Sequence, residues 1–175
     1  MAFSNSCIAI AGIDDITSLL NLLNNAYRGE GSKQGWTTEA HLIAGEVRTN
    51  EDNLLKIIQT PGSVMLKYTN ASGEITGCVN LQQRSNEIYL GMLSVSPQLQ
   101  GGGIGKQLLL AAEEYTHDLN CNYIYMTVIS VRTELIEWYK RNGYYDTGEK
   151  QDFKEDDLSG KHLQPLEFIV LEKKI

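Results

Sequence analysis

The segment Gln100–Lys106 reads QGGGIGK, and its glycines stand between an apolar run and a run with helical spacing. Glycine has no Cβ, so the main chain can turn sharply there and lie close to a ligand. The first turn of a helix offers N–H groups without acceptors, together with a partial positive charge. A glycine-rich turn that leads into a helix is therefore predicted to bind an anion such as phosphate.

The spacing of these glycines excludes two common phosphate-binding loops. A P-loop requires Gly, four residues and then Gly-Lys-Ser/Thr, but the chain has Gln100 and Gln107 at the outer positions. The dinucleotide fingerprint GxGxxG fails as well, because its third glycine would fall on Lys106 or Leu108. The loop therefore belongs to another class of phosphate site.

Apolar periodicity predicts strands and helices in a single domain over residues 1–175. Strands are expected at Cys7–Ala11, Ser63–Thr69, Ile75–Gln83, Glu87–Val95, Tyr123–Ile129, Tyr144–Glu149 and Leu166–Glu172. Helices are expected at Ile16–Ala26, Glu39–Arg48, Asp52–Gln59, Ile104–Leu119 and Thr133–Arg141. This order of elements indicates a mixed α/β domain.

Charge and composition limit the partners. The chain has 22 Asp and Glu against 15 Lys and Arg, a formal charge of −7, which argues against nucleic acid. The negative charge either slightly favours a cationic acceptor or only maintains solubility. The scattered cysteines and histidines predict neither a disulfide framework nor a metal site. No signal-like start or span-length apolar run is visible, so we expect a cytoplasmic protein without a membrane partner.

A second motif lies downstream, where Trp138–Tyr144 reads WYKRNGY. The loop fits the spacing Gln-x-x-Gly-x-Gly at Gln100, Gly103 and Gly105, and the second motif fits Tyr-x-x-x-Gly-Tyr. Both resemble segments of the GNAT superfamily of acyl-CoA N-acyltransferases. The loop alone is also compatible with a chance glycine-rich turn, but the two motifs in this order are more specific, and the resemblance covers most of the chain.

The resemblance implies a mostly antiparallel central sheet of about six to seven strands flanked by about four helices. Within it, Glu87–Val95 and Tyr123–Ile129 should splay apart. It also implies acetyl-CoA as cosubstrate, with the pantetheine arm on the strand before the loop and the pyrophosphate on the loop backbone. The corresponding residues are Leu93, Ser94, Val95, Gln100, Gly101, Gly102, Gly103, Ile104, Gly105 and Lys106. Lys106 either adds a charge-assisted contact or is a solvated lysine of the first helical turn.

In such enzymes a tyrosine commonly protonates the leaving thiolate, and Tyr139 occupies the matching position. A phenol with a pKa of about 10 stays protonated at neutral pH, so it can act as the general acid. Tyr139 could instead be a core aromatic residue at helical spacing from Leu135.

The sequence departs from the family pattern at two positions. Arg132 stands where many relatives have Asn, so it either contacts a coenzyme phosphate or lies outside the site. Thr127 stands where some relatives have a glutamate base and cannot serve as one. The base is therefore unassigned. Glu87 is a candidate that could act through water, and Glu39 and His41 are alternatives; each could equally be a solvated surface residue.

Acceptor recognition is expected in the loop Tyr27–Thr38, by analogy with the variable first-helix region of the family. Trp36 and Glu39 could form the wall of a pocket, although Trp36 could equally close the start of a helix. Tyr89 and Tyr125 lie on the two strands that should flank the coenzyme, and both could instead be packing residues.

The resemblance therefore implies an N-acetyltransferase that transfers acetyl from acetyl-CoA directly to a primary amine of a small molecule or peptide. The alternative is a non-catalytic acyl-CoA-binding or sensing domain. No metal is expected. Family members are frequently homodimers, and the strand-like C-terminus Leu166–Ile175 could pair across such an interface.

Overall fold

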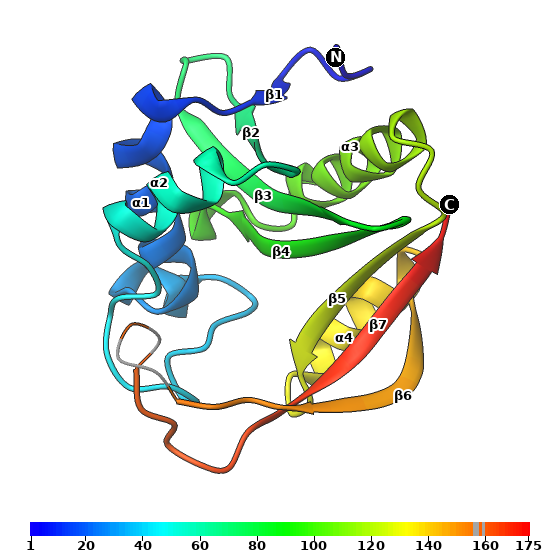
Figure 1. Ribbon diagram of the computed structural model, residues 1–175. Coiled ribbons are helices and arrows are strands. Elements are labelled where there is room, and N and C mark those ends of the chain that lie inside the picture. Colours follow the sequence, from blue (N-terminus) through cyan, green and yellow to red (C-terminus); the bar gives the residue numbers. More distant parts are fainter. Residues whose placement is uncertain (156–157, 159) are drawn as a thin grey trace.

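The computed structural model describes residues 1–155, 158 and 160–175, which are built around one seven-stranded sheet (Figure 1). The strands lie in the order β1-β2-β3-β4-β5-β7-β6. Their bounds are β1 (Ile8–Ile10), β2 (Ser63–Thr69), β3 (Ile75–Arg84), β4 (Glu87–Val95), β5 (Tyr123–Ile129), β6 (Tyr145–Asp152) and β7 (Glu167–Lys174). Only the β4–β5 pair is parallel. The expected mixed, mostly antiparallel sheet is confirmed.

In this described part of the chain, four α-helices cover the two faces of the sheet: α1 (Ile16–Tyr27), α2 (Glu51–Gln59), α3 (Ile104–Asp118) and α4 (Thr133–Arg141). Three short 3₁₀ turns lie between the elements: η1 (Ile13–Asp15) between β1 and α1, η2 (Glu30–Gln34) between α1 and α2, and η3 (Pro97–Leu99) between β4 and α3. Among the described residues, no helix has the length and apolarity to cross a membrane.

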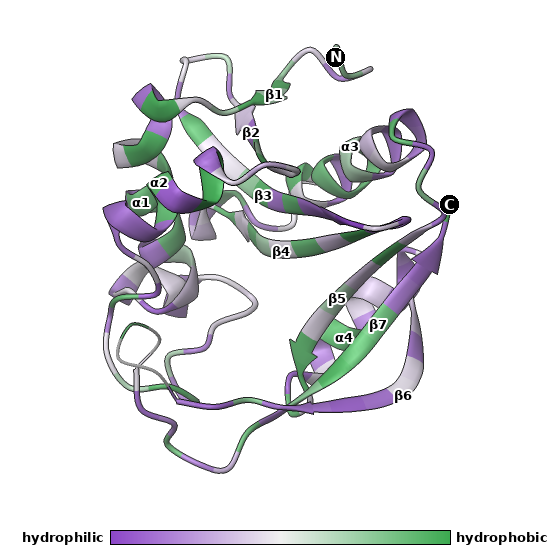
Figure 2. Cartoon of the chain, viewed as in Figure 1, coloured by the Kyte–Doolittle hydropathy of each residue, from purple (hydrophilic) through white to green (hydrophobic). Residues whose placement is uncertain are grey.

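Side-chain alternation along the central strands supplies a core on each face. Met65 and Cys78 pack with α1 and α2, whereas their neighbours Leu66 and Val79 pack with α3. Successive residues of a strand point to opposite faces, so these strands need apolar residues at nearly every position. Figure 2 shows the resulting concentration of hydrophobic residues on the inner strands.

The edge strand β6 is hydrophilic and exposed at every residue (Figure 2). Charged side chains on such an edge oppose pairing with another chain. The C-terminal strand β7, in contrast, is hydrogen-bonded to β5 on one side and to β6 on the other. It therefore has no free edge over Glu167–Glu172, so a second copy of the chain cannot pair with it along this stretch; a homodimer stays a prediction.

The predicted helix over Glu39–Arg48 is also wrong. Residues 39–48 form turns and an isolated bridge between Ile43 and His162. Glu39 is buried in ion pairs with two arginines, and these tertiary contacts override a weak local preference for helix. Helix α2 begins only after Asn50, whose side chain accepts the N–H of Asn53 at 2.9 Å.

Strands β4 and β5 pair only at one end, over Glu87–Tyr89 and Tyr123–Tyr125. Beyond Tyr89, β4 remains paired with β3, and β5 remains paired with β7. Figure 1 shows the two strands diverging. The predicted splayed pair is confirmed, and it leaves one backbone edge of the last residues of β4 unpaired.

Candidate active site

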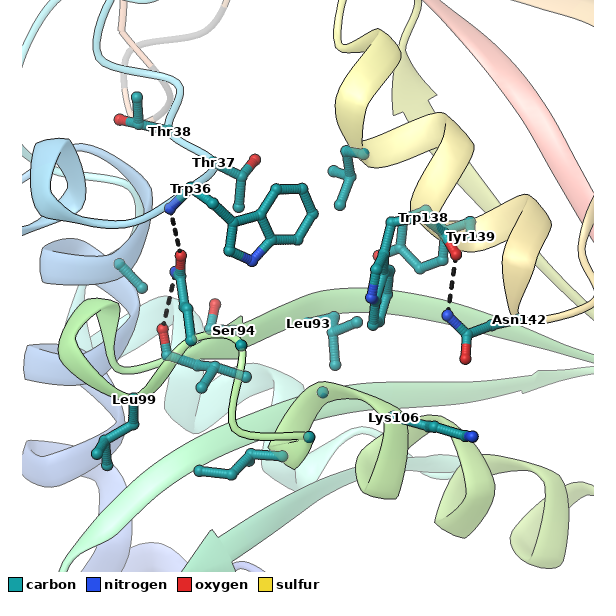
Figure 3. A pocket seen from close by; sticks show the side chains of 18 of the residues that line it. Trp36, Thr37, Thr38, Leu93, Ser94, Leu99, Lys106, Trp138, Tyr139 and Asn142 are labelled. Atoms are coloured by element: carbon teal, nitrogen blue, oxygen red, sulfur yellow. Dashed lines mark hydrogen bonds between the residues drawn. The ribbon is translucent and has the colours of Figure 1, made fainter.

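A cavity of about 420 Å³ lies where β4 diverges from β5, between the start of α3 and helix α4. The three predicted strand residues Leu93, Ser94 and Val95 line it. Trp36 and Trp138 also line it and contact each other, with ring centroids 6.3 Å apart (Figure 3). We refer to this space as the first cavity.

The glycine loop forms one wall of the first cavity. Gly101 and Gly103 have φ of 83° and 87°, a conformation that glycine adopts readily and other residues rarely do. Gly103 is the N-cap of α3, and no described acceptor binds the N–H groups of Gly103, Ile104, Gly105 or Lys106. Such a group of free donors at a helix N-terminus can bind phosphate.

Two other glycines let α3 approach its neighbours closely. A Cβ at Gly77 would lie 2.8 Å from Cγ2 of Ile104, and a Cβ at Gly105 would lie 3.3 Å from Cζ2 of Trp138. Gly102 is the one predicted loop glycine that does not line the cavity. Its N–H instead donates to the carbonyl oxygen of Leu99 at 3.3 Å, which closes the turn.

Gln100 connects the loop to the segment that carries Trp36. Its Oε1 accepts the N–H of Trp36 at 3.0 Å, and its Nε2 donates to the carbonyl of Val95 at 3.3 Å (Figure 3). Gly35 packs on the same amide, since a Cβ there would clash with Oε1 of Gln100. The indole of Trp36 is thus held over the cavity by a side chain of the glycine loop.

A β-bulge in β4 lies beside the cavity. The β3–β4 register shifts between Cys78 and Asn80, and Met92 has a φ of 52°. A bulge places two residues opposite one and changes the direction of the strand. Next to it, the hydroxyl of Tyr27 donates to the carbonyl of Leu93 at 3.3 Å.

Tyr139 lies on α4 and is only 5% exposed. Burial, followed by the nearby Tyr27 and Tyr144, raises the pKa of its phenol well above the usual value of about 10. Its ring packs edge-on against Trp138 and Tyr144, with centroids 5.0 and 5.7 Å away. Its hydroxyl makes no hydrogen bond to any described residue, so its proton is available to a ligand.

A second cavity of about 110 Å³ adjoins the first one. The residues that line both are Tyr27, Leu93, Arg132, Leu135 and Tyr139. The second cavity extends from them between β4 and β5. Tyr89 lines it, with its hydroxyl 3.3 Å from Oγ1 of Thr127. The two cavities therefore meet at Leu93 and Tyr139.

Glu39 lines the second cavity as part of a buried ion cluster. Its carboxylate is 3.4 Å from Nη2 of Arg28 and 3.1 Å from Nη1 of Arg132. Arg132 also donates to Oγ1 of Thr37 and lies 3.6 Å from Glu134. The guanidinium of Arg132 thus has protein partners, and Arg132 also lines the first cavity; its contact with a coenzyme phosphate stays a prediction.

Three other predicted candidates, Glu87, Tyr125 and His41, line neither cavity. Glu87 is the first residue of β4, six residues before Leu93. A strand rise of about 3.3 Å per residue places it roughly 20 Å from the junction. That is too far for one bridging water, so the expectation that Glu87 is the base is wrong. Tyr125 contacts the ring of Tyr89 instead, at 5.4 Å between centroids.

Several lining residues are not predicted from the sequence, among them Trp138 and Arg48. Trp138 directly precedes Tyr139, and this adjacency is the one feature of the sequence that could have indicated its place in the site. Arg48 lines the second cavity from an irregular segment. Its position depends on Asn24, whose Oδ1 accepts the N–H of Arg48 at 2.7 Å; no local pattern reveals such a contact. In the described part of the chain, no group of three or more His, Cys, Asp or Glu could hold a metal ion.

The family profile described as the acetyltransferase (GNAT) family matches residues 17–144, a range that contains both sequence motifs. None of the curated proteins matches the sequence significantly.

The fold is similar to that of several solved N-acetyltransferases. The ribosomal-protein-S18-alanine N-acetyltransferase of Escherichia coli has 15% identity and a TM-score of 0.69, with 96% of this chain and 92% of that one covered. The ribosomal-protein-alanine N-acetyltransferase of Brucella melitensis has 17% identity and a TM-score of 0.71, covering 96% and 99%. The PaiA N-acetyltransferase of Thermoplasma acidophilum, solved with coenzyme A, has 19% identity and a TM-score of 0.68, covering 96% and 99%.

Proposed function

The chain belongs to the acetyltransferase (GNAT) family, and from this premise we propose that it transfers acetyl from acetyl-CoA directly to a primary amine of a small molecule or peptide. The observation that carries the proposal is the junction of the two cavities at Leu93 and Tyr139. One side of the junction offers free N–H groups to phosphate, and the other offers a separate small space to an acceptor. A protonated phenol lies between them.

The first cavity would hold the coenzyme. The N–H groups from Gly103 to Lys106 would bind the pyrophosphate, and the Lys106 ammonium would add a charge-assisted contact. The pantetheine arm would follow the unpaired edge of β4 along Leu93, Ser94 and Val95. The Ser94 hydroxyl supports this, because it is buried without a hydrogen-bond partner and a bound ligand could satisfy it.

Acetyl-CoA supplies the activated thioester, and Tyr139 would supply the proton that the leaving sulfur needs. The raised pKa keeps the phenol protonated throughout the neutral range. The attacking amine loses one proton while the sulfur gains one, so the reaction is balanced. Glu39 is already bound by two arginines, so we assign the acceptance of the amine proton to water in the second cavity.

Direct transfer fits the positions of the cysteines. None of them lines either cavity, and burial raises the pKa of the Cys78 thiol to about 12. A thiol that stays protonated is a poor nucleophile. No cysteine of the chain is therefore suited to form an acyl-enzyme intermediate.

The test combines a thermal-shift titration with acetyl-CoA and a thiol-release assay over a panel of amines. A ligand at a hundred times its Kd stabilises the folded state by about 2.7 kcal/mol, so binding should be visible as a higher Tm. Stabilisation with turnover of an amine supports the proposal. Stabilisation without turnover of any amine would favour the non-catalytic acyl-CoA sensor, and no stabilisation would contradict both.

A further inference from the structure

The second cavity contains a cation that has no counter-charge. Arg48 is half-buried and lines this cavity, and its guanidinium carbon lies 5.3 Å from the centroid of the Tyr27 ring. No ion pair among residues 1–155, 158 and 160–175 includes Arg48. A partly desolvated guanidinium that faces a cavity is a natural partner for an anion.

The carboxylate of the cavity does not neutralise Arg48. Glu39 is held by Arg28 and Arg132 at 3.4 and 3.1 Å. Burial raises the pKa of Tyr27 to about 12, and the charge of Arg48 opposes that increase. Arg48 therefore adds an uncompensated positive potential on this side of Tyr27.

The backbone around Arg48 is fixed in position. Asn24 on α1 accepts the N–H groups of Arg48 and Thr49, at 2.7 and 3.0 Å, and donates to the Thr49 carbonyl at 3.1 Å. Thr49 is fully buried. A charged group on a rigid support loses less entropy on binding than one on a mobile loop.

The size of the second cavity and its distance from the junction limit the acceptor. Tyr27 contacts Arg48 with its ring and the Leu93 carbonyl with its hydroxyl. The path from Arg48 to the junction is therefore about the length of one phenol side chain. The cavity of about 110 Å³ would hold roughly four waters at ~30 Å³ each, so only a small group fits between these two ends.

We propose that the acceptor is a small amine that also carries a carboxylate, and that Arg48 binds this carboxylate while the amine reaches the junction at Leu93 and Tyr139. The inference rests on the proposed acetyl transfer and specifies its substrate class. A guanidinium matches a carboxylate with two parallel charge-assisted hydrogen bonds. Losing such a contact should reduce kcat/KM roughly 10- to 100-fold.

The experiment compares glycine, β-alanine and longer ω-amino acids with the amino alcohols of the same chain length, by thiol release from acetyl-CoA. The wild-type protein should prefer the acid over the alcohol by at least roughly tenfold at one chain length. Arg48→Gln should abolish this preference without changing the KM for acetyl-CoA. Arg48→Lys should retain part of it, because an ammonium keeps the charge but not the two-pronged geometry.

Arg84→Gln is the matched control. Arg84 also stacks on a tyrosine ring, with its guanidinium carbon 4.9 Å from the centroid of Tyr89, but it lines neither cavity. This variant should keep the full preference for the acid. A preference that survives in Arg48→Gln, or that disappears equally in Arg84→Gln, would overturn the assignment to Arg48.

Two readouts separate this inference from the proposed function. Turnover of amino alcohols at the same rate as amino acids would overturn the inference and leave acetyl transfer intact. Calorimetry of the CoA-loaded wild-type protein with the same amino acids and alcohols tests carboxylate binding without chemistry. Carboxylate-selective binding without any turnover would support the inference and contradict acetyl transfer, and equal or absent binding of both series would overturn the inference. These outcomes are measured on the wild-type protein with the two series of compounds, so they can be decided even where a variant does not fold.

Discussion

The two cavities that meet at Tyr139 are lined by different kinds of chemical group. The first presents main-chain N–H groups of one continuous segment, Gly103–Lys106, at the start of a helix. The second presents side chains from separate parts of the chain, among them Glu39, Arg48 and Tyr89. A main-chain site depends on glycine and on backbone conformation, whereas a side-chain site depends on each residue and its partners. We therefore expect substitutions in the first cavity and in the second cavity to have different effects on stability and on ligand binding.

The largest effect is expected for Glu39→Gln, which changes a residue that lines the second cavity. The carboxylate is buried between Arg28 and Arg132, and removing one partner of a buried ion cluster typically costs about 3–5 kcal/mol. Urea unfolding should show this loss in the free energy of unfolding. Protein that remains folded should bind acetyl-CoA at most a few-fold more weakly, because Glu39 does not line the first cavity and acts on it only through Arg132.

Glu134→Gln is the control for this variant, because Glu134 contacts the same Arg132 at 3.6 Å but has a side chain that is 42% exposed. An exposed pair contributes at most about 1 kcal/mol. If the two variants lost equal stability, the buried cluster would not be what holds the second cavity together.

The next effect concerns Tyr139, where the two sides meet. Tyr139→Phe should lower kcat by roughly 10²–10³-fold, in the range for loss of a general acid. The KM for acetyl-CoA and the Tm should change little, because the hydroxyl makes no hydrogen bond to a described residue. Since burial raises the pKa of this phenol, ionisation of Tyr139 should not reduce the wild-type kcat below about pH 10.

Tyr144→Phe separates chemistry from packing. Tyr144 packs edge-on against Tyr139, and its hydroxyl is buried without a partner. Removal of that hydroxyl should leave kcat unchanged and should not lower stability. An equal loss of kcat in both variants would indicate that the aromatic cluster, and not the proton of Tyr139, is what matters.

The same contrast explains how much could be predicted from the sequence. The loop at Gln100–Lys106 was predictable because glycine spacing and a helix start are local properties of the sequence. The structure places Tyr139 in the same cavity as this loop. The helix expected over Glu39–Arg48 does not form, because Glu39 is used in contacts with residues far along the chain. Glu87 was selected for being on the correct strand, but its position along that strand places it at the wrong end. No local sequence pattern indicates that Arg48 lines a cavity.

In the first cavity, where we propose that the coenzyme binds, Gly103→Ala should weaken acetyl-CoA binding roughly tenfold, about the value of one hydrogen bond to a charged group. Gly103 has a φ of 87°, so alanine should shift the backbone and misplace the N–H groups at the start of α3. Calorimetry measures this Kd directly. Gly73→Ala is the control, because Gly73 has a φ of 83° in a turn and a Cβ added there would meet no atom within 4 Å.

Both glycine variants should lose about 1 kcal/mol of stability, the cost of a left-handed conformation for alanine. Only Gly103→Ala should affect acetyl-CoA. If Gly73→Ala weakened binding to the same extent, the loss would reflect general destabilisation, and the main-chain assignment for the phosphate would be contradicted.

The smallest effect tests whether the two sides are independent. Gln100 binds the N–H of Trp36, the adjacent Thr37 binds Arg132, and Arg132 binds Glu39. This chain of contacts runs from the glycine loop to the second cavity. Gln100→Ala removes two hydrogen bonds worth about 0.5–1.5 kcal/mol each, so we expect the KM values for acetyl-CoA and for the acceptor to rise together, each by roughly two- to fivefold.

Gln98→Ala is the matched control for that coupling. Gln98 also connects η3 to η2, through Gln34 at 3.2 Å, but it is exposed and lines neither cavity. Steady-state kinetics of this variant should match the wild type for both substrates. If Gln100→Ala raised only the KM for acetyl-CoA, the two cavities would be independent units joined solely at Tyr139, because Trp36 and Arg132 would then hold their positions without the loop.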